Sequence, residues 1–102
     1  MENFVYYGEL FNIYGSLLNQ SNTKYYKLYY EENLSMQEIA DLENVSKSYV
    51  GSIIKKTSAI LDDYENKLHI YKDRFSLDKA LLENDINKVK SVIEAILGGI
   101  YE

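Results

Sequence analysis

Several residue types that common protein chemistries need are missing or rare. The sequence contains no cysteine, no proline and one histidine. Without cysteine the chain can form neither a disulfide nor a thiolate metal site, and His69 alone cannot form a histidine cluster around a metal. Without proline or a long glycine- or serine-rich tract, no stretch has the composition of an interdomain linker. We therefore expect one domain without a metal or other cofactor, in a reducing, cytoplasmic setting.

Basic residues are also outnumbered. The 102 residues include 11 Lys and Arg against 16 Asp and Glu, which gives a formal net charge of −5. This is the wrong sign for a protein that coats nucleic acid by bulk electrostatics, so any positive surface must be local. The apolar fraction of 46% is that of an ordinary globular protein, and no apolar run is long enough to cross a membrane. We expect neither a signal peptide nor membrane insertion.

Apolar residues at steps of three and four predict an all-α fold. We expect a first helix over residues 3–19 and a second helix that is capped by Ser21 or Asn22 and ends after Tyr30. A third helix should begin at Met36. These three segments precede a longer helix.

The longer helix should run from a cap at Ser46 to about Asp73. Its seam alternates steps of four and three through Val50, Ile54, Thr57, Leu61, Tyr64, Leu68 and Tyr71. Two C-terminal helices should follow, one capped by Ser76 and the other ended by the pair Gly98 and Gly99. The fold class predicted is therefore an all-α helix-turn-helix bundle of five or six helices, with one long helix and a C-terminal helical extension.

We expect residues 1–102 to form a single helical domain. Residues 1–73 would be the helix-turn-helix core, including the long helix, and residues 74–102 the C-terminal helices. The last helix carries an apolar stripe of Ile86, Val89, Ile93, Ile96 and Ile100. A chain of this size has few elements left to cover that stripe together with the far half of the long helix. The C-terminal helices are therefore expected to serve in packing or dimerisation, with a homodimer as the assembly.

The stretch LSMQEIADLENVSKSYVGSIIKK, residues 34–56, has the features of a helix-turn-helix. Ser35 and Glu38 have the spacing of a capping box at a helix start. Asn44 tolerates the left-handed backbone of a tight turn, and Ser46 can cap the next helix. The residues expected inside the hairpin are Ile39, the small residue Ala40, Val45, Val50 and Ile53.

The second helix of this motif would present a polar surface. Its candidate nucleic-acid-binding residues are Ser46, Lys47, Ser48, Tyr49, Ser52, Lys55 and Lys56. Lysines can hold phosphates, which orients a protein without reading sequence, and this surface has no Arg, Asn or Gln for a bidentate base contact. We expect weak to moderate binding of DNA or RNA, mainly through phosphates. The rival hypothesis is a non-enzymatic helical adaptor that binds a protein partner without touching nucleic acid.

Four stretches within about the first seventy residues carry a resemblance to a known family. They are LLN at 17–19, KLYYEENLSMQEIA at 27–40, VSKSYVGSIIKKT at 45–57 and LDDYENKL at 61–68. In order and spacing the chain resembles the bacterial YlxM-type helix-turn-helix family, which is itself similar to the fourth conserved region of sigma factors. Genes of that family commonly lie beside those of the signal recognition particle GTPase. The resemblance therefore implies a small helical regulator with a role in the signal recognition particle pathway, acting on DNA, RNA or particle components.

The chain departs from the family pattern near the turn. Glu43 stands where the family usually has an aromatic residue, which leaves Leu42 to supply the apolar contact. Lys47, Ser48 and Tyr49 replace Arg, Gln and Ala at the start of the second helix. These changes weaken the case for base reading more than the case for the fold.

Other clusters point less clearly to a function. Two i, i+4 pairs are formed by Tyr25, Tyr26, Tyr29 and Tyr30. They suit either stacking on unpaired RNA bases or packing in the core, and we favour packing. His69 has no nucleophile in a catalytic setting, and the carboxylate pairs Asp62 with Asp63 and Glu83 with Asp85 lack a metal motif. No phosphate-binding or dinucleotide motif occurs. We expect no enzymatic activity.

Overall fold

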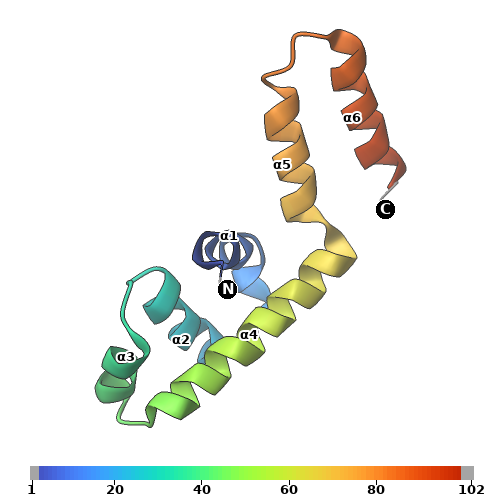
Figure 1. Cartoon of the computed structure of the whole chain (residues 1–102). Helices are drawn as coiled ribbons and strands as arrows, with labels where there is room; N and C mark the ends of the chain where they lie inside the picture. Colours follow the sequence, from blue (N-terminus) through green and yellow to red (C-terminus); the bar gives the residue numbers. More distant parts are fainter. Residues whose placement is uncertain (1–2, 100–102) are drawn as a thin grey trace. The chain divides into compact units, whose positions relative to one another are not determined.

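The computed structural model describes residues 3–99, and every regular element in that range is helical (Figure 1). The elements are α1 (Phe4–Tyr14), the short 3-10 helix η1 (Gly15–Leu17), α2 (Gln20–Tyr30), α3 (Met36–Glu43), α4 (Lys47–Leu68), α5 (Ile70–Ala80) and α6 (Ile86–Gly98). The predicted all-α class is confirmed. No helix in the described range is both long and apolar enough to cross a membrane.

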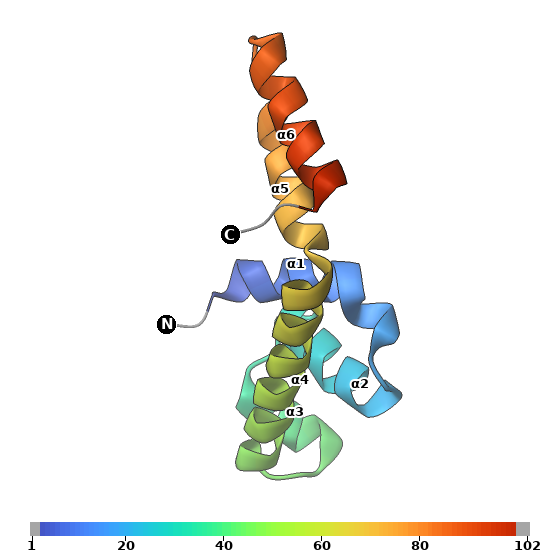
Figure 2. The same cartoon turned by 90° about the vertical axis from the view of Figure 1, so that its right-hand side faces the viewer.

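The chain divides into two compact units between Leu68 and His69. In the first unit α1, α2 and α3 all pack on α4, and the two views show all three lying along one side of it (Figures 1 and 2). In the second unit α5 and α6 pack side by side as an antiparallel hairpin.

The first unit contains nearly all of the buried apolar side chains. They are Leu10, Phe11, Tyr14, Tyr25, Tyr26, Tyr30, Ile39, Ala40, Val50, Ile54 and Leu61. On α4 the buried positions recur at steps of three and four, so one face of this helix packs against the core. The opposite face of α4 is left to solvent.

Tyrosine hydroxyls bind the polar groups along the inner side of α4. The Tyr14 hydroxyl donates to Glu65 Oε1 at 2.6 Å, and both residues are buried. The Tyr7 hydroxyl donates to Asp62 Oδ2 at 2.9 Å, and the hydroxyls of Tyr26 and Ser58 lie 2.6 Å apart. Buried carboxylates and hydroxyls are tolerated when they are hydrogen-bonded in this way.

Four predicted helix boundaries are wrong. The first helix, expected over residues 3–19, ends at Tyr14, and the chain continues to Leu17 as the 3-10 helix η1. α2 begins at Gln20 because Asn19, not Ser21 or Asn22, is the cap: its side chain accepts from the Asn22 N–H at 2.8 Å. α4 ends at Leu68 rather than near Asp73, because His69 takes the left-handed conformation with φ of 58°.

The fourth wrong boundary concerns α5. This helix begins directly after His69, so Ser76 lies inside it and does not cap it. The predicted end of α6 is confirmed, since Gly99 follows the helix in the left-handed conformation. Ile100, the last residue of the predicted apolar stripe, lies outside the described residues.

The buried pair of Tyr14 and Glu65 gives a stability prediction. Changing Tyr14→Phe removes the hydroxyl that donates to a buried carboxylate, and we expect the free energy of unfolding to fall by about 1.5–3 kcal/mol. Tyr7→Phe is the matched control, because its bond to Asp62 is only partly buried and should contribute less. Urea unfolding followed by far-UV circular dichroism measures both. A loss for Tyr14→Phe no greater than that for Tyr7→Phe would contradict this account of the core.

Candidate nucleic-acid interface

Helices α3 and α4 form the predicted helix-turn-helix. The capping box at the start of α3 is confirmed: the Glu38 N–H donates to Ser35 Oγ at 3.0 Å, and the Ser35 N–H donates to Glu38 Oε1 at 2.8 Å. Asn44 takes the left-handed conformation with φ of 61° and ends α3. The Val45 N–H then donates to the Ala40 carbonyl at 3.0 Å, which closes the turn.

The interior of the hairpin is close to the prediction. Ile39, Ala40 and Val50 are buried, while Val45 and Ile53 are only half-buried. Ile54 takes the inward position beside Val50 instead, in keeping with a spacing of four residues on one helix face. The small side chain of Ala40 lies where the two helices meet.

The start of α4 is capped as predicted. The Tyr49 N–H donates to Ser46 Oγ at 3.1 Å, and no acidic residue occupies the first turn of the helix. The backbone N–H groups of a first turn carry the positive end of the helix dipole, which favours an anion nearby. This end of α4 is thus electrostatically suited to a phosphate.

The structure leaves all seven predicted site residues exposed. They are Ser46, Lys47, Ser48, Tyr49, Ser52, Lys55 and Lys56. A helix turns about 100° per residue, so Ser48, Ser52, Lys55 and Lys56 share the face opposite the core, and Lys47 lies to one side of it. No carboxylate within residues 3–99 forms an ion pair with these lysines.

Two of the site residues are held by local contacts. The Ser52 hydroxyl donates to the Tyr49 carbonyl at 2.8 Å, so it is left as an acceptor toward solvent. The Tyr49 ring packs edge-on against Tyr25 of α2, with ring centroids 5.9 Å apart, and is still 45% exposed. Tyr49 therefore has a fixed apolar side and an accessible one.

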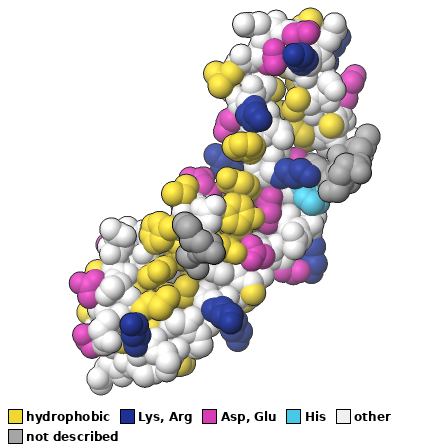
Figure 3. All heavy atoms as spheres, in the orientation of Figure 1, with side chains coloured by type: hydrophobic (Ala, Val, Ile, Leu, Met, Phe, Trp, Pro, Cys, Tyr) yellow, Lys and Arg dark blue, Asp and Glu magenta, His cyan; other side chains and the backbone are white. Residues whose placement is uncertain are grey.

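Charge along α4 is divided into two parts. From Lys47 to Leu61 the helix carries three lysines and no acidic residue. The acids that follow have partners: Asp62 accepts from Tyr7, and Asp63 pairs with Lys67 at 2.9 Å. The hydrogen bond from Lys67 to Asp63, together with their attraction, raises the pKa of Lys67. The basic part of α4 is thus local, and in the face shown in Figure 3 basic side chains lie singly rather than in one large patch.

The position before the turn differs from the prediction. Leu42 was expected to supply the apolar contact there, but its side chain is 62% exposed. Glu43 points back instead and forms an ion pair with Lys24 of α2. The hydrogen bond and charge of Glu43 raise the pKa of Lys24. An ion pair to α2 therefore takes the place of the expected apolar contact.

The chain matches the model of one protein family over residues 1–97, nearly its full length. The family is UPF0122, described as "Putative helix-turn-helix protein, YlxM / p13 like", which is a description of a binding fold and not of an enzyme. A "Probable UPF0122 protein" of Mycoplasma mycoides is 40% identical over 94 residues, covering 86% of this chain and 83% of the relative.

Two further relatives carry the same family name. A UPF0122 protein of Fusobacterium nucleatum is 34% identical over 97 residues, covering 95% of this chain and 94% of the relative. A UPF0122 protein of Streptococcus mutans is 45% identical over 64 residues, covering 63% of this chain and 58% of the relative. The family model itself spans both the helix-turn-helix and most of the C-terminal hairpin.

Gly51 provides a stability test that leaves the candidate interface unchanged. A Cβ atom at Gly51 would meet only the Met36 sulfur at 3.6 Å, an ordinary contact, so Gly51→Ala should raise the free energy of unfolding by up to about 1 kcal/mol through helix propensity. Gly15→Ala is the control, since its Cβ would lie 3.2 Å from the buried Phe11 ring and should bring no gain. Thermal and urea unfolding test both. Destabilisation by Gly51→Ala would mean that this position is more tightly packed than the structure indicates.

Proposed function

The chain belongs to the UPF0122 family of YlxM/p13-like helix-turn-helix proteins, and on that premise we propose that it binds nucleic acid through the N-terminal half of α4 as a regulatory protein. The observation that carries the proposal is the stretch from Lys47 to Leu61: three exposed lysines and no acid, on a helix that begins with a capped, positive first turn. A phosphate backbone is the polyanion that such a surface fits.

The proposed contacts are mainly to phosphates. Lys55 and Lys56 lie on the outer face of α4, and Lys47 lies in its first turn to one side of that face, so the outer face and the N-terminal end of the helix can both contact a backbone. Ser48 and Ser52 offer only hydroxyls toward bases, and Ser52 already donates its hydrogen bond to its own helix. Such a surface supplies affinity with little sequence discrimination.

The remaining parts of the proposal concern assembly and cellular role. A homodimer would present two copies of α4, which doubles the phosphate contacts and adds a fixed spacing between them. The family resemblance supports a cytoplasmic role in the signal recognition particle pathway, which makes the particle RNA the first structured RNA to compare with duplex DNA. The proposal needs no catalytic step and no cofactor.

Charge reversal at the outer face of α4 tests the proposed interface. In a fluorescence anisotropy titration against labelled duplex DNA and signal recognition particle RNA, three lysine contacts predict a log-log salt slope of about −2.7 on duplex DNA, or about twice that for a dimer. Lys55→Glu with Lys56→Glu should abolish binding at moderate salt and leave helical content unchanged, because both side chains are exposed.

The matched control is Lys79→Glu with Lys88→Glu, two exposed lysines of the C-terminal hairpin that give the same change in net charge. The control should keep most of the binding, and the salt slope of the wild type should persist. Equal losses for the two double variants would mean that net charge rather than α4 governs binding. Absence of binding by the wild type even at low salt would overturn the proposal and favour the protein-binding adaptor.

A further inference from the structure

The α5–α6 hairpin leaves most of its large apolar side chains exposed. Ala80 is the only residue with a buried side chain within residues 69–99. Leu81 and Leu97 are 83% and 82% exposed, and Ile86 is 66% exposed. Leu77 and Ile93 are each 41% exposed. The contact between α5 and α6 thus leaves much of the apolar side-chain surface of the hairpin exposed to solvent.

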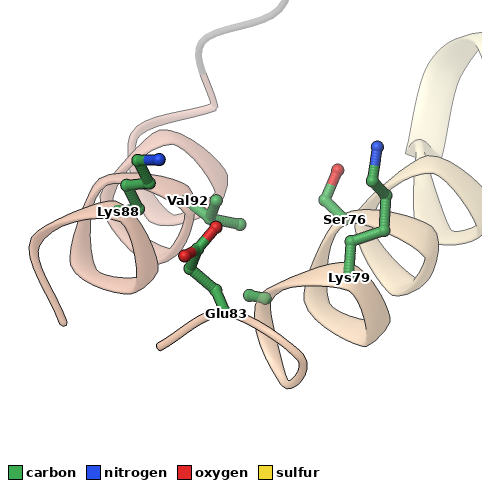
Figure 4. A pocket seen from close by; sticks show the side chains of 6 residues that line it. Ser76, Lys79, Glu83, Lys88 and Val92 are labelled. Carbon is green, nitrogen blue, oxygen red and sulfur yellow. The ribbon is translucent and has the colours of Figure 1, made fainter. Parts of the chain in front are cut away.

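The internal contact of the hairpin uses small and branched side chains. On α6 Val89, Val92 and Ile96 are half-buried, and on α5 Ser76 and Ala80 are the least exposed residues near them. A groove of about 340 Å³ on one side of this contact is lined by Ser76, Lys79, Ala80, Glu83, Lys88 and Val92 (Figure 4). Figure 4 shows the lysines rising from the two helices on either side of this groove. Lys79, Lys88 and Glu83 thus lie on one side of the hairpin.

Five of the exposed apolar residues lie on the other face, namely Leu77, Leu81, Ile86, Ile93 and Leu97. Phe75 and Leu82, which are 55% and 85% exposed, lie outside this face, and Phe75 contacts Lys79. At about 100° per residue, Leu77 and Leu81 lie roughly a quarter turn from the side of α5 that contacts α6. Ile86, Ile93 and Leu97 lie roughly a quarter turn from the side of α6 that contacts α5. Because the helices run antiparallel, these two rotations point to the same side of the hairpin, opposite Lys79 and Lys88.

Charged residues flank this apolar face on both edges. Arg74 and Asp78 lie one turn apart along α5, beside the stripe of Leu77 and Leu81. Lys90 and Glu94 lie one turn apart along α6, beside the stripe of Ile93. None of these four side chains forms an ion pair among the described residues. Each edge thus offers one unpaired positive and one unpaired negative group.

The heights of these charges match across the two helices. Ser76 and Ala80 of α5 share a groove with Val92 and Lys88 of α6. Because the antiparallel helices are joined by residues 81–85, we infer that residue 76 is level with 92 and residue 80 with 88. By the same count Arg74 is level with Glu94, and Asp78 is level with Lys90. Two copies of this face, related by a two-fold axis parallel to the helices, would therefore bring opposite charges together at both edges.

We propose that the apolar face of the α5–α6 hairpin binds the same face of a second copy of this chain, so that the two hairpins form an antiparallel four-helix bundle. The apolar stripes would form its core, and Arg74 and Asp78 of one copy would pair with Glu94 and Lys90 of the other. This inference rests on the homodimer of the proposed function and is independent of nucleic-acid binding.

Two properties of the hairpin favour a second copy over an unrelated partner. Its edge charges are self-complementary, whereas a face selected for a different acidic or basic protein would carry mainly one sign. A helical segment of this length without cysteine, and with no metal-binding cluster among residues 69–99, also gains stability most readily by oligomerisation. A four-helix bundle supplies the missing partner surface through the ordinary packing of antiparallel helices.

The first test measures assembly of the full chain by sedimentation velocity through the micromolar range, without nucleic acid. The wild type should dimerise. Leu81→Lys with Leu97→Lys should raise the dimer dissociation constant by roughly a hundredfold or more, since each dimer would lose four buried leucines. Leu42→Lys, at an exposed leucine of the first unit, should leave the dissociation constant unchanged. A monomeric wild type, or a dimer that the double variant leaves intact, would overturn the inference.

The second test uses charge reversal at the edges. Arg74→Glu alone should weaken the dimer roughly threefold to tenfold, the range expected for partly exposed ion pairs. Adding Glu94→Arg should restore the wild-type dissociation constant if α5 packs on α6 of the partner. Adding Asp78→Arg to Arg74→Glu should weaken the dimer further, because it would place like charges together. Failure of the Glu94→Arg rescue would reject the proposed arrangement. Because this assay contains no nucleic acid, its outcome is separate from that of the binding test on α4.

Discussion

The first unit depends on a single constraint: three helices pack on the same side of α4. The inward positions of α4 from Val50 to Leu61 are buried, and all of them except Thr57 are apolar. Farther along the helix Glu65 is buried and accepts a hydrogen bond from Tyr14. With that side fixed, the rotation of the helix about its own axis is fixed as well. The lysines and serines at 48–56 must then face solvent, so the exposure of the candidate interface follows from the packing of the core.

Tyrosine is the residue that makes this packing compatible with a polar helix. Tyr25, Tyr26 and Tyr30 are buried, and the rings of Tyr26 and Tyr30 contact each other at a tilt of 33°, with centroids 4.4 Å apart. The favoured interpretation of the tyrosine pairs is therefore confirmed for these three residues, while Tyr29 is half-buried. A tyrosine fills the core with its ring and still donates a hydrogen bond, which an aliphatic residue cannot do. In this way the hydroxyl of Tyr7 donates a hydrogen bond to Asp62, and the hydroxyl of Tyr14 donates one to Glu65.

The features that the sequence predicted well are those with a local physical cause. The capping box at Ser35, the left-handed Asn44 and the cap at Ser46 each depend on residues within four positions, and all three are confirmed. The predictions that failed needed information from elsewhere. The seam from Val50 to Tyr71 has continuous helical spacing, and nothing in that spacing marks the left-handed backbone at His69 that divides it between two helices.

Competition between equally good local signals explains the other errors. Asn19, Ser21 and Asn22 are all good helix caps, and burial of Asn22 in the first unit leaves Asn19 as the capping residue. At the turn, the partner of Glu43 is Lys24, nineteen positions earlier in the chain. An ion pair between separate helices has no periodic signature, so the choice between Leu42 and Glu43 could only be read from the folded structure.

The proposed binding of nucleic acid has to be reconciled with the negative net charge of the protein. A net charge of −5 repels a polyanion at long range, so a few lysines must act at short range, where the Debye length of about 8 Å at physiological salt limits the influence of distant acids. Three lysines and a helix terminus supply orientation but little base reading. Under the proposed function, discrimination between sites would then come from geometry, and a two-fold assembly would present two copies of α4 to the nucleic acid. The apolar face of the C-terminal hairpin would supply that assembly, and the lysine surface of α4 would supply the phosphate contacts.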